Sequence, residues 1–263
     1  MPDLYQQYCF DLIADNKREV QPKPIVTPNR AKVEKDVLRG LLRVSQLSHE
    51  HPAKQYIVDR KLPTPSHAFL YYTPNFTRWL NRLDPENVRR ESQHDPRIVI
   101  PLFDVNGEVF AVQGRAIAGQ HDRYITHKFY DHLKIFGINR INPNRNVKVL
   151  EGPFDSLFVT NAIAMAGGDV SLDELCECLH TTKERLVFVY DNEPRKRETV
   201  ERMRKVIRSG AKIVIWPKWM TQKDLNAAIL AGEIAPAEVD LVIDKHTFSG
   251  LEAQLQFALW SKV

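Results

Sequence analysis

Hydrophobic residues follow one pattern in the second half of the chain and another in the first. From residue 147 onward, short apolar runs alternate with stretches of helical periodicity, which is the order expected of a parallel sheet with crossover helices. The predicted strands are Val147–Leu150, Ile163–Met165, Leu186–Tyr190 and Ile213–Trp216, and the predicted helices are a short one from Asp155, Leu172–Leu179, Glu198–Ser209 and Leu225–Leu230.

Local signals support several of these elements. Ser171 and Glu174 form a capping box in front of one helix, and Gly210 follows the end of another. The tail is expected to add two helices, about Pro236–Asp244 and Gly250–Trp260, joined through Thr247–Ser249.

The first half lacks this alternation and predicts a mixture of helices and antiparallel strands. Arg97–Phe103 and Glu108–Gln113 are predicted to form a hairpin, because Asn106-Gly107 between them tolerates the positive φ of a tight turn. Pro101 predicts that the first of these strands is an edge strand or carries a bulge. Helices are expected at Leu4–Ala14, about Val33–Leu42, Pro52–Arg60 and around Trp79–Leu83.

Composition is that of a globular protein, with 263 residues, 43% apolar and 27% charged. No apolar run approaches the length of a membrane span, and three cysteines are too few for a disulfide framework, so we expect a cytoplasmic protein without a membrane partner. Charge is uneven: residues 1–150 hold 23 Lys and Arg against 16 Asp and Glu, and the remainder holds 14 against 17. A basic half beside an acidic half suits a protein that holds a polyanion and metal cations.

Acidic residues follow three of the predicted strands. Glu151 ends the first strand and is followed by Gly152, which allows a sharp turn, while Asp191 and Glu193 follow the third and Asp224 comes after the fourth. Open α/β sheets bind ligands at the carboxyl ends of their strands, and carboxylates that meet there favour a divalent-metal site.

This constellation resembles the Toprim domain of DnaG-type primases, topoisomerases and some nucleases, whose signature is Glu-Gly-x-x-Asp followed by Asp-x-Asp. The second motif departs from that pattern, because Glu193 stands where the signature has an Asp. A closer resemblance is to the DNA primases of T-even-type tailed phages, and it covers nearly the whole chain. The matching segments are Glu151–Phe158 (EGPFDSLF), Asp191–Arg195 (DNEPR) and Lys223–Asn226 (KDLN), with weaker matches at Gln113-Gly114-Arg115 and Ile135-Phe136-Gly137.

The resemblance implies an α/β fold with a Toprim parallel-sheet domain at its centre. The expected divisions are residues 1–30 as an N-terminal helix and linker, 31–145 as a basic mixed α+β subdomain, 146–234 as the Toprim domain, and 235–263 as a helical C-terminal tail. The resemblance further implies that the protein synthesises RNA primers from ribonucleoside triphosphates on single-stranded DNA, with Mg²⁺ or Mn²⁺ as the metal ion. The expected place of action is the host-cell cytoplasm, if the gene belongs to a phage. A replicative helicase is the expected partner, contacted through the tail or the first helix.

Nucleotidyl transfer requires a deprotonated 3′-hydroxyl and neutralised phosphate charge, which two divalent ions provide. Asp191 and Glu193 are the expected metal ligands. Glu151 is either a ligand or the group that accepts the hydroxyl proton, and Asp155 is explained equally well as a carboxylate that stabilises a helix N-terminus. Asp224 completes the acidic set.

Basic residues are the candidates for holding nucleotides and nucleic acid. Arg115 and Lys134 match the family's basic motif, whereas Arg195 and Lys223 either bind triphosphate or pair with neighbouring acids. The interleaved aromatic residues Tyr124, Phe129, Tyr130 and Phe136 are expected to lie mainly in the core. The full basic set is Arg115, Arg123, Lys128, Lys134, Arg195 and Lys223.

Zinc is not expected in this chain. Cys176, Cys178 and His180 fall on one predicted helix, where Cys178 points away from the other two, and no second ligand pair accompanies them. Primases of this kind usually begin with a zinc ribbon, so either the chain is truncated or a separate subunit supplies the ribbon. We therefore expect the chain to prime poorly by itself.

Two alternatives to a primase are a Toprim nuclease and a non-catalytic accessory module of the replisome. A nuclease would need no basic groove for an incoming triphosphate, and an accessory module would tolerate Glu151→Gln.

Overall fold

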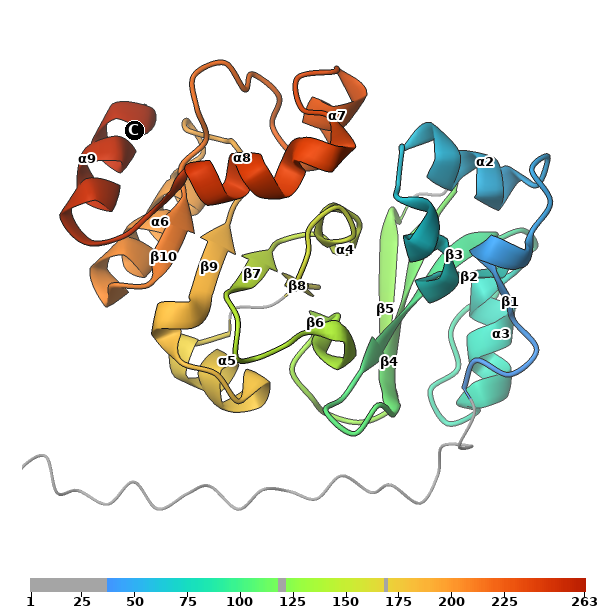
Figure 1. The fold of residues 1–263 in the computed structure, drawn as a ribbon. Coiled ribbons are helices and arrows are strands. Elements are labelled where there is room, and N and C mark those ends of the chain that lie inside the picture. Colours follow the sequence, from blue (N-terminus) through green and yellow to red (C-terminus); the bar gives the residue numbers. More distant parts are fainter. Residues whose placement is uncertain (1–36, 118–121, 168–169) are drawn as a thin grey trace, which may run out of the picture. The chain divides into compact units, whose positions relative to one another are not determined.

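The computed structural model describes residues 37–117, 122–167 and 170–263 (Figure 1). Contacts divide the chain into residues 1–31 and 32–263, so all described residues belong to the second unit. The helix expected at Leu4–Ala14 and the linker that follows it lie outside the described residues.

The first sheet is antiparallel, with strand order β1-β2-β3-β4-β5. Its predicted hairpin is confirmed: Ile100 pairs with Gln113, and Gly107 has a φ of 78° in the connecting turn. The prediction for Pro101 is confirmed: β2 pairs only with Arg97–Val99 of this strand, so Pro101 has a paired neighbour on one side alone, and a register shift follows at Leu102/Phe103. The elements are β1 (Leu42–Arg43), α2 (Pro52–Asp59), β2 (Tyr71–Thr73), α3 (Phe76–Leu83), β3 (Arg97–Phe103), β4 (Val109–Ala116) and β5 (Tyr124–Lys128), with short 3₁₀ turns at Val44–Gln46 and Thr64–Phe69.

The helix expected at about 33–42 is wrong in its described part. Residues 37–40 form turns, and Leu42 pairs with Tyr72 in the sheet. Gly40 lies at a φ of 82°, a left-handed conformation that interrupts a helix.

The second sheet has the order β11-β10-β9-β7-β8-β6. Strands β10, β9, β7 and β8 are parallel, as predicted, while β6 and β11 are antiparallel additions at the two edges. The chain passes from β7 to β8 on one side and then crosses to β9 on the other, so the strand order reverses at β7 and β9. The strands are β6 (Ile135–Phe136), β7 (Val147–Leu150), β8 (Ala162–Met165), β9 (Leu186–Val189), β10 (Lys212–Val214) and β11 (Thr247–Phe248).

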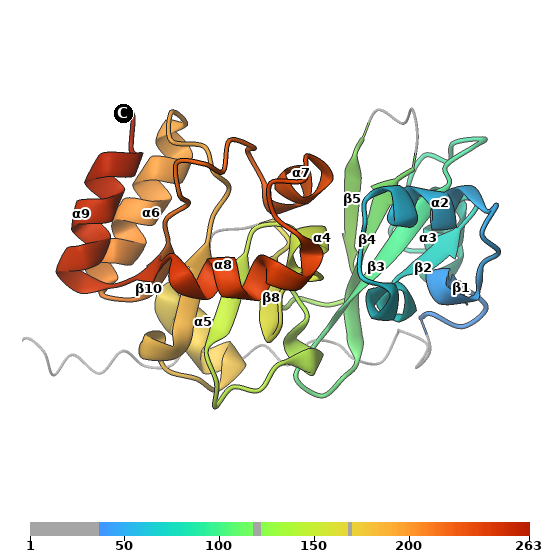
Figure 2. The ribbon, with the colours of Figure 1, turned by 45° about the horizontal axis from the view of Figure 1, so that its top comes forward.

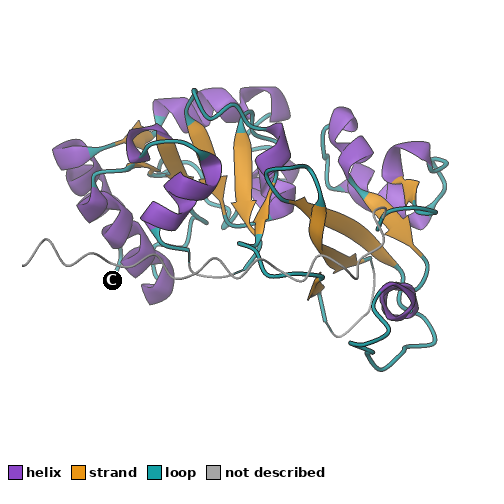
Figure 3. Cartoon of the chain, turned by 90° about the horizontal axis from the view of Figure 1, so that it is seen from below, coloured by secondary structure: helices purple, strands orange, loops and turns teal. Residues whose placement is uncertain are grey.

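Helices cover both faces of this sheet because side chains along each strand alternate between them (Figure 3). Leu150 and Val214 pack in one core cluster with α4, α7 and α8, whereas Val149 and Ile213 belong to clusters formed with α5, α6 and α9. The helices are α4 (Pro153–Ser156), α5 (Leu172–Leu179), α6 (Arg197–Ser209), α7 (Leu225–Leu230), α8 (Val239–Lys245) and α9 (Gly250–Trp260), with 3₁₀ turns at Ile138–Arg140, Lys183–Arg185 and Pro236–Glu238.

The tail contributes more than the two helices predicted for it. The segment expected to join them forms β11, in which Thr247 pairs with Val214. The tail therefore extends the sheet at its edge.

The two sheets share one apolar core. A single cluster contains Ile98 and Ile100 of β3 together with Leu150 of β7 and Val189 of β9. This packing joins β3 of the first sheet to β7 and β9 of the second.

Candidate active site

The predicted acids lie where neighbouring strands end. Glu151 follows β7 and Asp191 follows β9, and these two strands pair in parallel at the point where the strand order reverses. Asp155 lies in α4 directly after Glu151, and Asp224 is the residue in front of α7. The topology thus directs all of these acids toward one edge of the sheet.

Asp191 is at the electrostatic centre of this group. Burial, followed by repulsion from Glu151, Asp155, Asp224 and Glu193, raises the pKa of its carboxyl from 3.8 to about 7. A carboxyl that interacts with all four other acids cannot lie far from any of them. The structure therefore brings the five predicted acids into one region.

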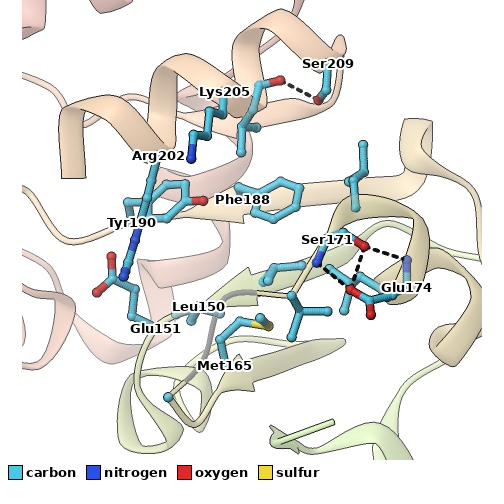
Figure 4. Close-up of a pocket in the computed structure, with 16 residues that line it drawn as sticks. Leu150, Glu151, Met165, Ser171, Glu174, Phe188, Tyr190, Arg202, Lys205 and Ser209 are labelled. Atoms are coloured by element: carbon cyan, nitrogen blue, oxygen red, sulfur yellow. Dashed lines mark hydrogen bonds between the residues drawn. The ribbon is translucent and has the colours of Figure 1, made fainter. Parts of the chain in front are cut away.

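Glu151 has an unsatisfied oxygen. Its Oε1 is buried and accepts no hydrogen bond, and burial raises the pKa of the carboxyl against the opposing influence of Arg202 and Lys196. Figure 4 shows Glu151 at one end of a cavity of about 730 Å³, with Arg202 and Tyr190 beside it. A buried oxygen without a partner costs on the order of 1–3 kcal/mol, which a bound cation or proton would recover.

Three of the acids are already engaged, and one of them, Asp155, accepts from the Asn226 N–H at 2.9 Å. Glu193 accepts from Lys196 Nζ at 2.8 Å and from Thr199 Oγ1 at 3.3 Å, and Asp224 caps α7 by accepting from the Ala227 N–H at 2.7 Å. In the described part of the chain, no three His, Cys, Asp or Glu side chains converge closely enough to hold an ion as they stand.

The donor set nevertheless fits a hard divalent cation. It consists of carboxylates, three of which, on Glu151, Asp155 and Asp191, form no ion pair with any described residue. The Lys196–Glu193 pair is only partly buried, with 48% of the lysine side chain exposed, so a divalent cation can compete with the lysine for this carboxylate. Glu151 and Asp191 are the acids best placed to hold metal.

Asn192 serves a structural purpose between the two motif acids. Its Nδ2 donates to the carbonyls of Met220 and Gln222 at 2.8 and 3.1 Å, and its backbone N–H donates to Lys223 O at 2.7 Å. Its Oδ1 accepts from Trp260 Nε1 at 2.9 Å. These bonds fix the segment Asp191–Arg195, which we call the acid segment.

Of the predicted basic residues, Arg115 is the buried one. It is buried in β4, its Nε donates to Tyr56 Oη at 2.8 Å, and its guanidinium stacks over Tyr124 at 4.5 Å from the ring centre. Tyr124 has Asp155 as another charged neighbour, which places Arg115 beside the acidic edge of the second sheet.

The other predicted basic residues are less tightly held. Arg123 and Arg195 are exposed, and Lys134 is half-buried. Lys128 pairs with Asp131 at 2.8 Å, and Lys223 lies 3.7 Å from the carboxylate of Asp224. Of the interleaved aromatic rings, Phe136 is buried, Phe129 and Tyr130 are half-buried, and Tyr124 is 39% exposed.

Sequence reasoning missed Arg60 and Asn226 as site residues. Arg60 Nη1 donates to Asn226 Oδ1 at 2.7 Å, and Asn226 Nδ2 donates back to Arg60 O at 2.8 Å. The backbone N–H of Asn226 donates to Asp155 at 2.9 Å. Asn226 was visible as the last residue of the KDLN match, whereas Arg60 gave no signal beyond its place after a predicted helix.

Asp155 belongs to this junction. Burial raises the pKa of its carboxyl from 3.8 to about 6, the Asn226 N–H opposes the rise, Asp224 adds to it, and Arg60 opposes it. The Arg60 guanidinium stacks over Tyr56 and Phe154, at 4.9 and 5.8 Å from the ring centres, and its Nε is buried without an acceptor.

Cys176 and Cys178 pack against an apolar cluster of the second sheet. Burial raises the pKa of both thiols, which keeps them protonated, and neither forms a disulfide in the structure. Both cysteines are therefore explained by packing.

Within the described ranges, no helix is both long enough and apolar enough to cross a bilayer.

No family model matches the chain. It is 32% identical over 271 aligned positions to the DNA primase of Enterobacteria phage T4, covering all of this chain and 76% of that protein. It resembles the structure of the Aquifex aeolicus primase (zinc-binding and RNA polymerase domains), with a TM-score of 0.60, 18% identity, and coverage of 87% of this chain and 65% of that one.

Two further structures have the same fold. The DnaG primase catalytic domain bound to single-stranded DNA gives a TM-score of 0.62 at 16% identity, over 83% of this chain and 78% of that one. The E. coli primase catalytic core gives 0.58 at 16% identity, over 81% of this chain and 78% of that one.

Proposed function

This chain belongs to the DNA primase family, and from that premise we propose that it joins ribonucleotides into short primers on a single-stranded DNA template. The observation that carries the proposal is the position of Asp191 among four other acids, next to a Glu151 oxygen without a partner. The nuclease and accessory-module alternatives are not favoured by the relatives found.

The reaction forms a bond between the 3′-oxygen of one nucleotide and the α-phosphorus of the next. The bond from that phosphorus to the leaving pyrophosphate breaks, and the hydroxyl proton passes to a base or to solvent. Glu151, Asp191 and Glu193 would hold Mg²⁺ or Mn²⁺, with Asp155 and Asp224 in support. The bound ions would lower the pKa of the hydroxyl and neutralise charge on the phosphates.

The chain's own residues arrange the substrates around these acids. Arg115, fixed by Tyr56 and Tyr124, would hold the triphosphate on the basic side, and Arg60 lies in the same cluster. A guanidinium held by stacking loses little freedom when it binds phosphate. The more exposed Arg123, Lys128, Lys134, Arg195 and Lys223 would follow the phosphates of the template or substrate, which makes binding depend on salt.

Partners follow from the family as proposals. A replicative helicase would bind through the tail or the N-terminal segment. A zinc ribbon, on the same polypeptide or a separate one, would select the start site, and the expected place of action is the host-cell cytoplasm. Adding a separate zinc-ribbon protein should raise primer yield; an unchanged yield would contradict the version in which another subunit supplies the ribbon.

The direct test measures incorporation of labelled ribonucleotides on oligonucleotide templates with Mg²⁺, alongside cleavage of the same oligonucleotides. Labelled primers that disappear with Glu151→Gln are the expected result. Cleavage without primers would establish the nuclease, and activity that is indifferent to the substitution would remove Glu151 from the site.

A further inference from the structure

Helix α9 is apolar on two opposite faces. Ala253, Phe257 and Trp260 are buried against the cluster that contains α6 and β10. On the opposite face Leu251, Leu255 and Leu259 are 71%, 60% and 63% exposed at a spacing of four residues. We call these three residues the leucine stripe.

Exposed leucines scattered singly are ordinary, but three in register on one helix form a contiguous patch. A helix that is apolar all round is normally covered on every side. Within residues 37–117, 122–167 and 170–263, no element packs on the leucine stripe. Figures 1 and 2 show α9 beside α6, with its other side turned away from the sheet.

A cavity continues the stripe at its C-terminal end. It has a volume of about 940 Å³, and Leu259 and Trp260 form part of its wall. Apart from Arg195, which is assigned above to phosphate, its lining holds the cations Lys196, Lys218 and Lys262 against one carboxylate, Glu193, which already accepts from Lys196. The surface therefore combines an apolar stripe with an excess of positive charge.

We propose that the leucine stripe and this cavity dock an amphipathic helix of another protein, one whose apolar face is flanked by Asp and Glu. Leucines spaced along one helix face match the apolar positions of a partner helix, and the cavity can receive one larger side chain. The excess of cations favours acidic flanks and disfavours a second copy of this chain, which would bring the same cations together. Single-stranded nucleic acid fits less well inside the cavity, because its bases need exposed aromatic faces, and Trp216 and Trp260 in the cavity wall are 4% and 8% exposed. Trp219, beside the cavity, is 49% exposed, so a nucleic-acid competitor is included in the test.

Docking there would act on the acid segment. Trp260 Nε1 donates to Asn192 at 2.9 Å, and the Lys262 N–H donates to Pro194 O at 2.9 Å, so the end of α9 is bonded directly to the segment between Asp191 and Arg195. A partner that repositions α9 would therefore change the rate of primer synthesis. This second step rests on the proposed function, and the docking step does not.

Binding is tested by fluorescence anisotropy with the full chain. The probe is a labelled helical peptide with leucines along one face and glutamates beside them, and the matched peptide has lysines in place of the glutamates. The acidic peptide should bind saturably, about tenfold more weakly to Leu255→Glu, and equally well to Leu241→Glu, which changes a 68% exposed leucine on α8. The double variant Leu251→Gln/Leu259→Gln repeats the test if the glutamate variant lowers the melting temperature.

Several results would overturn docking: no saturable binding, equal binding of the acidic and basic peptides, or no effect of Leu255→Glu. Displacement of the peptide by an oligothymidylate would assign the surface to nucleic acid. A dimer in light scattering that Leu255→Glu dissociates would assign it to a second copy.

The link to the acid segment is tested by primer synthesis with and without the acidic peptide. The peptide should alter primer yield for the natural chain. Trp260→Phe, which keeps a ring and loses the donor, should still bind the peptide in the anisotropy assay but show no change in yield when the peptide is added. Binding without a change in yield would overturn the link. If the chain makes no primers even without peptide, the proposed function fails, while the anisotropy result still decides docking.

Discussion

Asn226 and Arg60, 166 residues apart in the chain, exchange two hydrogen bonds. Through its own backbone N–H, Asn226 also holds Asp155. The buried amide Asn226 therefore links Arg60, which directly follows α2, to the carboxylate of Asp155 in the second half of the chain. The first prediction follows from this link.

Asn226→Ala should lower kcat/KM for primer synthesis about 10- to 100-fold, because a small displacement of a positioning group costs that much. Arg60→Ala should cause a similar loss, and the double variant should lose little more than either single one. Lys61→Ala is the matched control: its Nζ donates to Ile229 O in the same helix as Asn226, but it touches none of the acids. If the losses in kcat/KM of the two single variants add up in the double variant, or if Lys61→Ala loses as much, the connection from Arg60 through Asn226 to Asp155 has no specific role in the reaction.

Glu151→Gln and Asp191→Asn should each reduce turnover about 10²- to 10⁴-fold, since both replace a carboxylate by an amide of the same shape. Single-stranded DNA should still bind, as measured by anisotropy at fixed salt. Glu177→Gln, an exposed acid on α5, serves as the control. Turnover within twofold of the natural chain would exclude either acid from the reaction.

The raised pKa of the Asp191 carboxyl also determines how the free energy of unfolding should depend on pH. Its pKa rises from 3.8 to about 7 on folding, so the folded state holds this proton more tightly. The metal-free protein should therefore lose stability as pH rises from about 4 to about 7. Asp191→Asn should melt at a higher temperature than the natural chain at pH 8, and the difference should vanish near pH 4.

A divalent metal ion should reverse the difference in melting temperature between Asp191→Asn and the natural chain at pH 8. Mg²⁺ or Mn²⁺ at pH 8 should raise the melting temperature of the natural chain, because the ion binds the ionised acids of the folded state. The same addition should leave Asp191→Asn nearly unchanged. An equal rise in both proteins would place the metal elsewhere.

Gly152→Ala should impair activity more than stability. A Cβ at this position would lie 2.7 Å from Oδ2 of Asp155, so the carboxylate must move away from the Asn226 N–H. We expect a loss of about tenfold or more in kcat/KM, with little change in melting temperature. At Gly210 a Cβ would meet nothing within 4 Å, but φ is 81°. Gly210→Ala should therefore lower the melting temperature and leave kcat/KM nearly unchanged.

Arg115→Lys should raise the KM for ribonucleoside triphosphates about tenfold, because lysine keeps the charge but loses the Nε bond to Tyr56 and the stack on Tyr124. Arg90→Lys, on the exposed surface of the same half, is the control. A KM that both variants leave unchanged would remove Arg115 from substrate binding.

The sequence predicted the second sheet well because its signals are local. Apolar runs, the capping box at Ser171 and the glycine at 210 each act within a few residues, and Glu151 and Asp191 come at the ends of two of these strands. The structure places the five acids together, although Asp224 and Glu193 are partly engaged by neighbours that the motifs do not reveal.

What the sequence missed depends on contacts between distant segments. Leu42–Arg43 became a strand because Tyr71 and Tyr72 pair with it, and Thr247–Phe248 is too short a strand to show a period. Gly152 was expected for a sharp turn, but its φ of −106° suits any residue, and the space taken by Asp155 is what excludes a side chain.

The side-chain amide of Asn192 donates to two backbone carbonyls, and its oxygen accepts from the Trp260 indole N–H. Hydrolytic loss of ammonia from this side chain during storage would replace the two donors by an oxygen that faces the carbonyls of Met220 and Gln222. An ageing preparation would then fade in activity while its backbone stayed intact. Mass spectrometry would reveal the lesion as a gain of about one dalton in the peptide that contains Asn192.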